Sequence, residues 1–76
     1  MNSSNFIKTI GPKISYIRKS RNLTQTEAAE LIGISQGFIS KLEKGTYVPD
    51  LETWIRICEV YELTFVFPKW YTRKSA

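Results

Sequence analysis

A chain of 76 residues forms one small domain that buries roughly 60% of its extended surface on folding, so its stability alone is marginal. Lys and Arg number 11 against 7 Asp and Glu, and the resulting net charge of +4 favours a polyanionic partner. The chain has no histidine and one cysteine, Cys58, which excludes an intrachain disulfide, the usual zinc-ligand sets and a triad that needs imidazole.

The first eight residues are polar and show no clear helical period. We therefore expect residues 1–8 to form a loose N-terminal arm. Phe6 and Ile7 are its two side chains that can pack onto the domain or onto a partner.

The first helix is predicted to begin at Thr9. With Thr9 as the N-cap, Pro12 falls in the first turn, where its missing N–H costs nothing. Asn22 can supply the left-handed residue that ends the helix. The inward-facing residues are expected at i, i+4 and i+7: Ile10, Ile14 and Ile17.

Residues 25–42, QTEAAELIGISQGFISKL, predict two short helices that meet at a sharp turn. Thr24 is expected to cap the first helix, with Glu27 completing a capping box. Gly33 can end that helix with a positive φ, and Ser35 can cap the next one. The apolar residues at helical spacing are Ala28, Leu31 and Ile32, then Phe38, Ile39 and Leu42. This arrangement is typical of a helix-turn-helix, whose second helix enters the DNA major groove.

Gly45 is expected to close the second of these helices, and Asp50 to cap a fourth. Cys58 falls on the apolar side of that fourth helix, where we expect a small core residue. No signal-peptide core and no run of about 18 apolar residues is present, which predicts a cytoplasmic location without a membrane partner.

Residues 64–67, TFVF, are β-branched or aromatic and precede Pro68, so they predict a short strand. A strand of this length is not stable alone, and its backbone groups need partners. We expect it to pair antiparallel with its copy across a two-fold axis, the alternative being a frayed tail. The expected division is an arm at 1–8, a DNA-binding domain at 9–63, a dimerisation strand at 64–68 and a basic aromatic tail at 69–76. The expected dimer interface is Ile57, Tyr61, Thr64, Phe65, Val66 and Phe67.

The helix-turn-helix stretch resembles the lambda-repressor/Cro family of regulators, also called the xenobiotic-response-element type. The matching residues, at positions 1, 5, 9, 15 and 18 of the stretch, are Gln25, Ala29, Gly33, Ile39 and Leu42. The flanks IGPKISYIRKSRNLTQ and ISKLEKGTYVPDLETWIRIC are similar to the family as well. The resemblance implies an all-α, lambda-repressor-like domain of four helices, to which the short C-terminal β-strand is added. In layout the chain is most similar to HipB-like antitoxins, which combine repression of their own operon with binding of a toxin.

Phosphate contacts are expected at both ends of the helix-turn-helix. Gln25 lies at a predicted helix N-terminus, where backbone N–H groups favour an anion, and the matching glutamine of the family contacts phosphate. The loop residues expected to hold the backbone are Lys44, Thr46 and Tyr47, for which an ordinary solvated turn is the alternative. The resemblance also implies an ion pair between Arg18 and Glu43.

Base contacts are expected from the outward side of the second helix: Ser35, Gln36, Gly37, Ser40 and Lys41. Gln36 can form two hydrogen bonds with adenine, and Lys41 can reach guanine. Because Gly37 has no side chain to offer, we expect modest base specificity that DNA shape supplements.

These features predict a DNA-binding transcriptional regulator, a repressor that acts as a homodimer on a palindromic operator. Two forms stay open: the antitoxin of a toxin–antitoxin operon, with a toxin as partner, or a stand-alone phage or chromosomal repressor. The alternative is a protein-interaction module with the same fold that does not bind DNA. We expect no enzyme activity and no cofactor.

Overall fold

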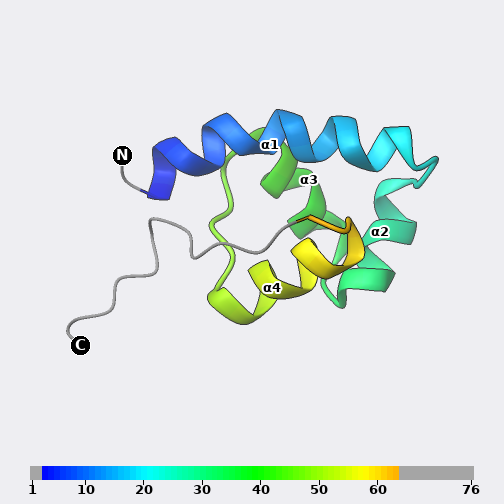
Figure 1. The fold of residues 1–76 in the computed structure, drawn as a ribbon. Helices are drawn as coiled ribbons and strands as arrows, with labels where there is room; N and C mark the ends of the chain where they lie inside the picture. Colours follow the sequence, from blue (N-terminus) through cyan, green and yellow to red (C-terminus); the bar gives the residue numbers. More distant parts are fainter. Residues whose placement is uncertain (1–2, 64–76) are drawn as a thin grey trace.

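The computed structural model describes residues 3–63, so the predicted strand and tail at 64–76 lie outside the described residues. Four helices follow one another: α1 (Ser3–Ser20), α2 (Gln25–Ile32), α3 (Gln36–Lys44) and α4 (Leu51–Val60). In Figure 1, α1 runs along the top, α2 stands near its C-terminal end, α4 lies below and α3 lies behind. All regular secondary structure of residues 3–63 is helical, and the number of helices is the one that the sequence predicted.

The first helix begins earlier than expected, because residues 3–8 belong to α1 and do not form a loose arm. Thr9 is therefore an interior residue of α1 and not its cap. Ile7 is 0% exposed, and its burial continues the apolar stripe of the helix toward the N-terminus. Pro12 lies inside α1, where it removes one helical hydrogen bond. The apolar surface buried at Ile7 helps to offset this loss.

Two glycines allow α1 and α3 to approach closely. A Cβ at Gly11 would lie 2.7 Å from the carbonyl oxygen of Leu42 and 2.8 Å from that of Glu43. At the end of α3, a Cβ at Gly45 would lie 2.8 Å from Cα of Lys8. These backbone contacts hold the C-terminal end of α3 against the first half of α1. These contacts were not predicted from the sequence, because they join residues that are distant in the chain.

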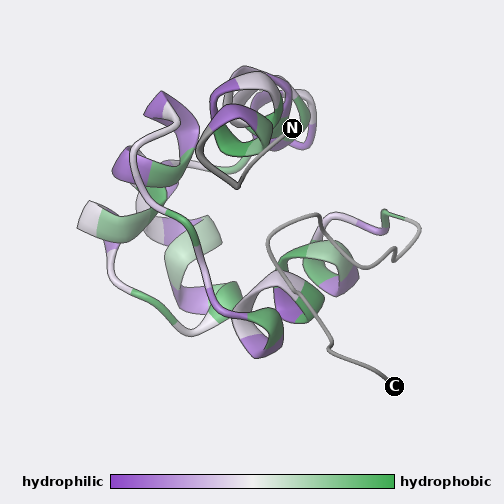
Figure 2. Cartoon of the chain, turned by 90° about the vertical axis from the view of Figure 1, so that its left-hand side faces the viewer, coloured by the Kyte–Doolittle hydropathy of each residue, from purple (hydrophilic) through white to green (hydrophobic). Residues whose placement is uncertain are grey.

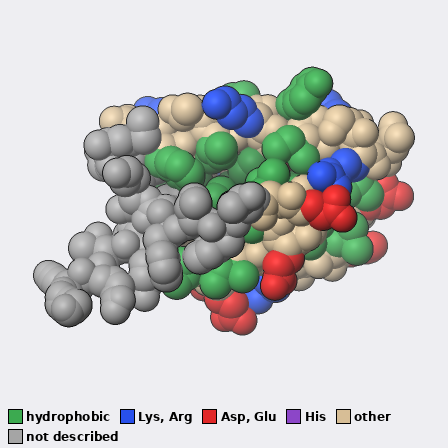
Figure 3. Space-filling model, viewed as in Figure 1, with side chains coloured by type: hydrophobic (Ala, Val, Ile, Leu, Met, Phe, Trp, Pro, Cys, Tyr) green, Lys and Arg blue, Asp and Glu red, His purple; other side chains and the backbone are tan. Residues whose placement is uncertain are grey.

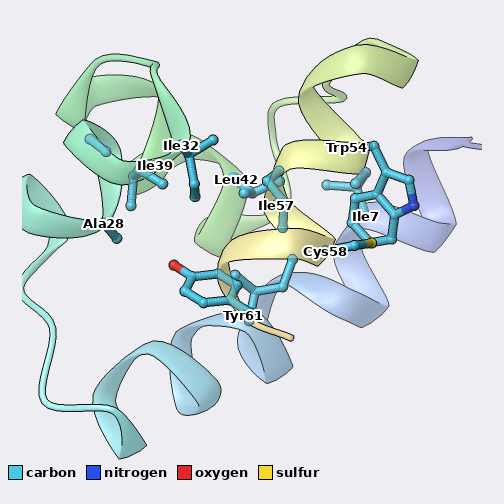
Figure 4. Packing of buried hydrophobic residues seen from close by; sticks show 11 residues of the cluster. Ile7, Ala28, Ile32, Ile39, Leu42, Trp54, Ile57, Cys58 and Tyr61 are labelled. Carbon is cyan, nitrogen blue, oxygen red and sulfur yellow. The ribbon is translucent and has the colours of Figure 1, made fainter. Parts of the chain in front are cut away.

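The core lies where the four helices meet. In Figure 4, Ile32, Ile39, Leu42 and Ile57 converge between α2, α3 and α4. Cys58 is 2% exposed, which confirms it as a core residue. The buried cluster consists of Ile7, Ile14, Ala28, Ala29, Ile32, Ile39, Leu42, Trp54, Ile57, Cys58 and Tyr61. Figure 2 shows α1 end-on, with its hydrophobic side turned toward the other helices.

Two residues from the predicted apolar sets are exposed. Leu31 is 59% exposed and Phe38 is 43% exposed. Each directly precedes a fully buried isoleucine, Ile32 or Ile39, and neighbouring side chains on a helix point about 100° apart. Leu31 and Phe38 therefore lie at the sides of their helices and not on the buried face.

Two residues of the expected dimer interface, at and just after the end of α4, are buried in the core. Ile57 and Tyr61 are each 0% exposed and belong to the core cluster, so they offer no free surface to a second copy. The buried apolar residues of α4 itself are Trp54, Ile57 and Cys58. On the face drawn in Figure 3, apolar side chains gather between α1 and α4.

Within residues 3–63, no helix is both long and apolar enough to cross a membrane.

Candidate nucleic-acid interface

The start of α2 and the turn between α2 and α3 have the capping residues that the sequence predicted. The hydroxyl of Thr24 accepts a hydrogen bond from the Glu27 amide at 3.1 Å, and the Glu27 carboxylate accepts one from the Thr24 amide at 2.8 Å. Gly33 follows α2 with φ 88°. The hydroxyl of Ser35 then accepts a hydrogen bond from the Phe38 amide at 3.2 Å. Because these contacts fix where α2 ends and α3 begins, the angle of the turn is specified locally.

One side of α3 is buried and the opposite side is open. Ile39 and Leu42 are 0% exposed on the inner side. The expected base-contacting residues lie along the outer side. Four of them are exposed, namely Ser35, Gln36, Gly37 and Lys41, and Ser40 is half-buried. The structure thus brings this expected set together on one surface.

A buried ion pair lies beneath one edge of this surface. Nε of Arg18 donates to Oε2 of Glu43 at 2.6 Å, and the two side chains are 9% and 7% exposed. Arg18 also donates to the carbonyl oxygen of Leu23 at 2.7 Å. The hydrogen bond with Glu43 raises the pKa of Arg18, whereas burial works in the opposite direction. The predicted pair between Arg18 and Glu43 is therefore present.

A chain of hydrogen bonds leads from this pair to the surface. Nε2 of Gln25 donates to Oε1 of Glu43 at 3.1 Å. Nε2 of Gln36 in turn donates to Oε1 of Gln25 at 2.7 Å. We call Arg18, Glu43, Gln25 and Gln36 the polar edge of α3. Gln36 uses one amide hydrogen here and keeps its second N–H and its carbonyl oxygen for a ligand.

From the sequence, Gln25 is expected at phosphate and Gln36 at a base, and the hydrogen bond between their side chains was not predicted. The partners in the polar edge come from α1, α2 and α3, so no spacing rule within one helix predicts them. The bond restricts the orientation of the Gln36 side-chain amide.

Two aromatic rings lie at the opposite side of α3. Phe38 and Tyr47 are stacked, with centroids 4.7 Å apart and planes inclined by 10°. Burial and the charge of Asp50 raise the pKa of Tyr47, and a hydrogen bond with Thr53 opposes the rise. The Tyr47 hydroxyl thus lies beside the start of α4, while its ring faces Phe38. We call Phe38 and Tyr47 the apolar edge of α3.

The remaining expected phosphate contacts lie at the end of α3. Lys44 is exposed in its last turn. The Thr46 hydroxyl donates to the carbonyl oxygen of Lys41 at 3.2 Å, and the Thr46 amide donates to the same oxygen at 2.9 Å. Gly45, between Lys44 and Thr46, has φ 80°, as expected for a helix end. Thr46 therefore helps to end α3, whereas the charged side chain of Lys44 is exposed to solvent.

A helix-turn-helix family profile matches residues 14–67, which include the C-terminal part of α1 and all of α2, α3 and α4. The chain belongs to the lambda-repressor/Cro-type helix-turn-helix family. This is a family of DNA-binding regulators.

Three curated relatives agree with this assignment. The ImmF control region 10 kDa protein of Bacillus phage phi105 is 38% identical over 74% of this chain. Antitoxin PezA of Streptococcus pneumoniae is 37% identical over 75% of it, and the immunity repressor protein of Bacillus phage phi105 is 40% identical over 59%. The matched segments cover 62%, 36% and 31% of these three relatives, respectively.

In this chain α3 is the second helix of the motif, the position that enters the major groove in helix-turn-helix proteins. The polar edge and the apolar edge lie along the two sides of this helix. The exposed Lys41 and Lys44 lie between these edges on the outer side.

Proposed function

We propose that the chain is a DNA-binding transcriptional repressor that inserts α3 into the major groove. The observation that carries this proposal is the division of α3 into a fully buried side and an open side with two lysines and a hydrogen-bonded Gln36. Family membership supports the same surface. The net charge of +4 adds general attraction to a polyanion.

The proposal divides the contacts into two kinds. Base edges are contacted by the outer side of α3: Ser35, Gln36, Gly37, Ser40 and Lys41. Phosphates are contacted at the ends of the motif, by Gln25 at one end and by Lys44, Thr46 and Tyr47 at the other. Phosphate contacts position the protein on any duplex, whereas base contacts distinguish sequences.

We further propose a homodimer on a palindromic operator. The support is the sequence of residues 64–67, whose backbone groups need a partner strand. Pairing through these residues would place the two α3 helices about one DNA turn, ~34 Å, apart. Since Ile57 and Tyr61 are buried in the core, the proposed dimer relies on the segment 64–68 and not on those two residues.

The biological setting has two candidates. One relative is named an immunity repressor and another an antitoxin, so a stand-alone repressor and an antitoxin are both supported by likeness. The match with Antitoxin PezA covers 36% of that protein. The first candidate is therefore a stand-alone repressor, and the second is an antitoxin with a toxin as its partner.

Salt-dependent binding tests the proposal. Fluorescence anisotropy is measured with labelled duplexes, first of random sequence and then of sequences enriched by selection on the protein. Affinity should fall steeply with salt: the logarithm of the binding constant should fall with the logarithm of the salt concentration, with a slope of about −0.9 for each neutralised phosphate. If the protein binds none of the duplexes in a salt-dependent way, the result would favour the protein-interaction module instead.

Two variants separate the two kinds of contact. Lys44→Ala should weaken binding to all duplexes and lower the salt slope by about 1. Gln36→Ala should reduce preference at one base pair by roughly 1–3 kcal/mol and leave the slope unchanged. The matched control for charge is Lys13→Ala, which removes an exposed lysine from α1.

A further inference from the structure

Phe38 of the apolar edge is an exposed aromatic residue whose ring is not part of the core, whereas Tyr47 behind it packs against the core. Phe38 is 43% exposed although its ring is stacked at 4.7 Å on Tyr47. Phe38 belongs to the first turn of α3, directly before the buried Ile39. A large ring at this place borders the surface on which the proposed base contacts lie.

The neighbouring residue clears the space in front of this ring. A Cβ added at Gly37 would meet only the Ser35 hydroxyl oxygen, at 3.7 Å, which is ordinary contact. Packing within the chain therefore does not require a glycine here. The missing side chain instead lowers the surface beside Phe38 and lets a ligand approach both α3 and the ring.

The surroundings of the ring indicate the chemistry of the ligand. Lys41 and Lys44 are exposed on the adjoining outer side of α3. A partner that presents an apolar group beside anionic groups fits this combination of ring and cations. In the DNA major groove, the C5-methyl of thymine is the apolar group among the base edges, and phosphates border the groove.

We propose that Phe38, supported from behind by Tyr47, contacts the C5-methyl of a thymine in each half-site. This inference rests on the proposed function and adds a base contact that does not involve hydrogen bonds. Tyr47 stabilises the arrangement because its hydroxyl is held near Asp50 and Thr53 at the start of α4. A ring fixed in this way loses little conformational freedom on binding.

The test replaces single thymines by uracil, which removes only the methyl group. A duplex is first selected on the wild-type protein, and each thymine of one half-site is then replaced in turn. One replacement should weaken wild-type binding about four-fold, the equivalent of burying one methyl group, about 0.8 kcal/mol. Phe38→Ala should bind the thymine and uracil duplexes equally, while Phe38→Leu should keep part of the preference.

Controls separate this contact from folding and from general DNA binding. Tyr16→Ala removes an aromatic ring that is 74% exposed on α1, and it should keep the four-fold preference. Circular dichroism checks that Phe38→Ala keeps its helices, as expected for a side chain that is already 43% exposed.

Three results would overturn the inference. Uracil could have no effect on the wild-type protein at any position. Phe38→Ala could instead keep the full preference for thymine, so that another residue contacts the methyl. Phe38→Ala could also lose affinity equally for both duplexes with a smaller salt slope, which would place the rings against the sugar-phosphate backbone. In all three cases the protein still binds DNA, whereas failure of the proposed function would abolish duplex binding by the wild type.

Discussion

The two edges of α3 are held by different forces. The polar edge is a chain of hydrogen bonds that ends on a buried ion pair, with Arg18 and Glu43 at 9% and 7% side-chain exposure. The apolar edge is a stack of two rings, one of which is 43% exposed. Hydrogen bonds are directional, so the polar edge fixes the orientation of Gln36, whereas a stack fixes mainly the plane of Phe38.

The difference also sets the cost of losing each edge. A charge left alone in a buried site retains its full desolvation penalty, and the loss of one partner costs roughly 3–5 kcal/mol. An aromatic pair contributes about 0.5–1.5 kcal/mol beyond the area that it buries. We therefore expect the polar edge to determine stability as well as recognition, and the apolar edge to affect recognition more than stability.

The largest effect is expected from Glu43→Gln, which breaks the ion pair and leaves Arg18 buried without a counter-charge. Unfolding in urea should show a loss of about 3 kcal/mol or more in the free energy of unfolding. The matched control is Glu62→Gln, because Glu62 pairs with Arg21 at 3.0 Å but its side chain is 77% exposed. That control should cost about 0–1 kcal/mol.

Equal losses in Glu43→Gln and Glu62→Gln would show that burial of the pair adds nothing. A second comparison distinguishes the charge from the packing. The double variant Arg18→Met with Glu43→Leu removes both charges and should recover much of the stability lost by Glu43→Gln.

A smaller effect is expected from Gln25→Ala, which leaves the ion pair intact and removes the support of Gln36. Stability should fall by only about 0.5–1.5 kcal/mol. Preference at the base pair contacted by Gln36 should fall by roughly 1–3 kcal/mol, as for Gln36→Ala. The measurement is a double-mutant cycle of the two substitutions on a selected duplex, read as binding free energies.

The cycle should give a coupling of about 0.5–3 kcal/mol between Gln25 and Gln36. Additive effects would mean that Gln36 needs no orientation by Gln25. The inferred role of the polar edge in recognition would then have to be given up.

The smallest effect at neutral pH is expected from Tyr61→Phe, beneath the polar edge. Within the described residues, the Tyr61 hydroxyl has no hydrogen-bond partner, so its removal should change stability little. Burial, and next the charge of Glu43, raise the pKa of Tyr61 from 10.0 to about 12. The unfolded chain therefore loses this proton at lower pH than the folded chain does.

Stability of the wild type should consequently fall as the pH rises between these two pKa values, because the folded state then binds more protons than the unfolded state. Tyr61→Phe lacks this contribution and should lose stability less steeply over the same interval. Urea unfolding at a series of alkaline pH values measures both slopes. Equal slopes would contradict the raised pKa, and Tyr16→Phe controls for the loss of an exposed tyrosine.

Features with local causes were predictable from the sequence. The caps at Thr24 and Ser35, the positive φ at Gly33 and the cap at Asp50 depend on contacts within about three residues. Such contacts leave a signature in neighbouring letters of the sequence. The ion pair of the polar edge was implied by family resemblance, which carries long-range information that spacing lacks.

Features with distant causes were predicted wrongly or missed. Thr9 and Pro12 gave a local signal for a helix start, but the burial of Ile7 extends α1 to Ser3. The approach of α3 to Gly11 and the bond between Gln25 and Gln36 depend on how separate helices meet. Tertiary packing decides these features, so the order of residues alone does not reveal them.

The central claim is that the outer side of α3, bounded by its two edges, is the surface that meets DNA. Nuclear magnetic resonance of nitrogen-labelled protein, titrated with a duplex at low salt, tests it residue by residue. The largest shifts are predicted for backbone amides from Gln36 to Lys44 and for the side-chain amides of Gln25 and Gln36. Shifts confined to α4 or to the outer side of α1, with those of α3 unchanged, would contradict the account.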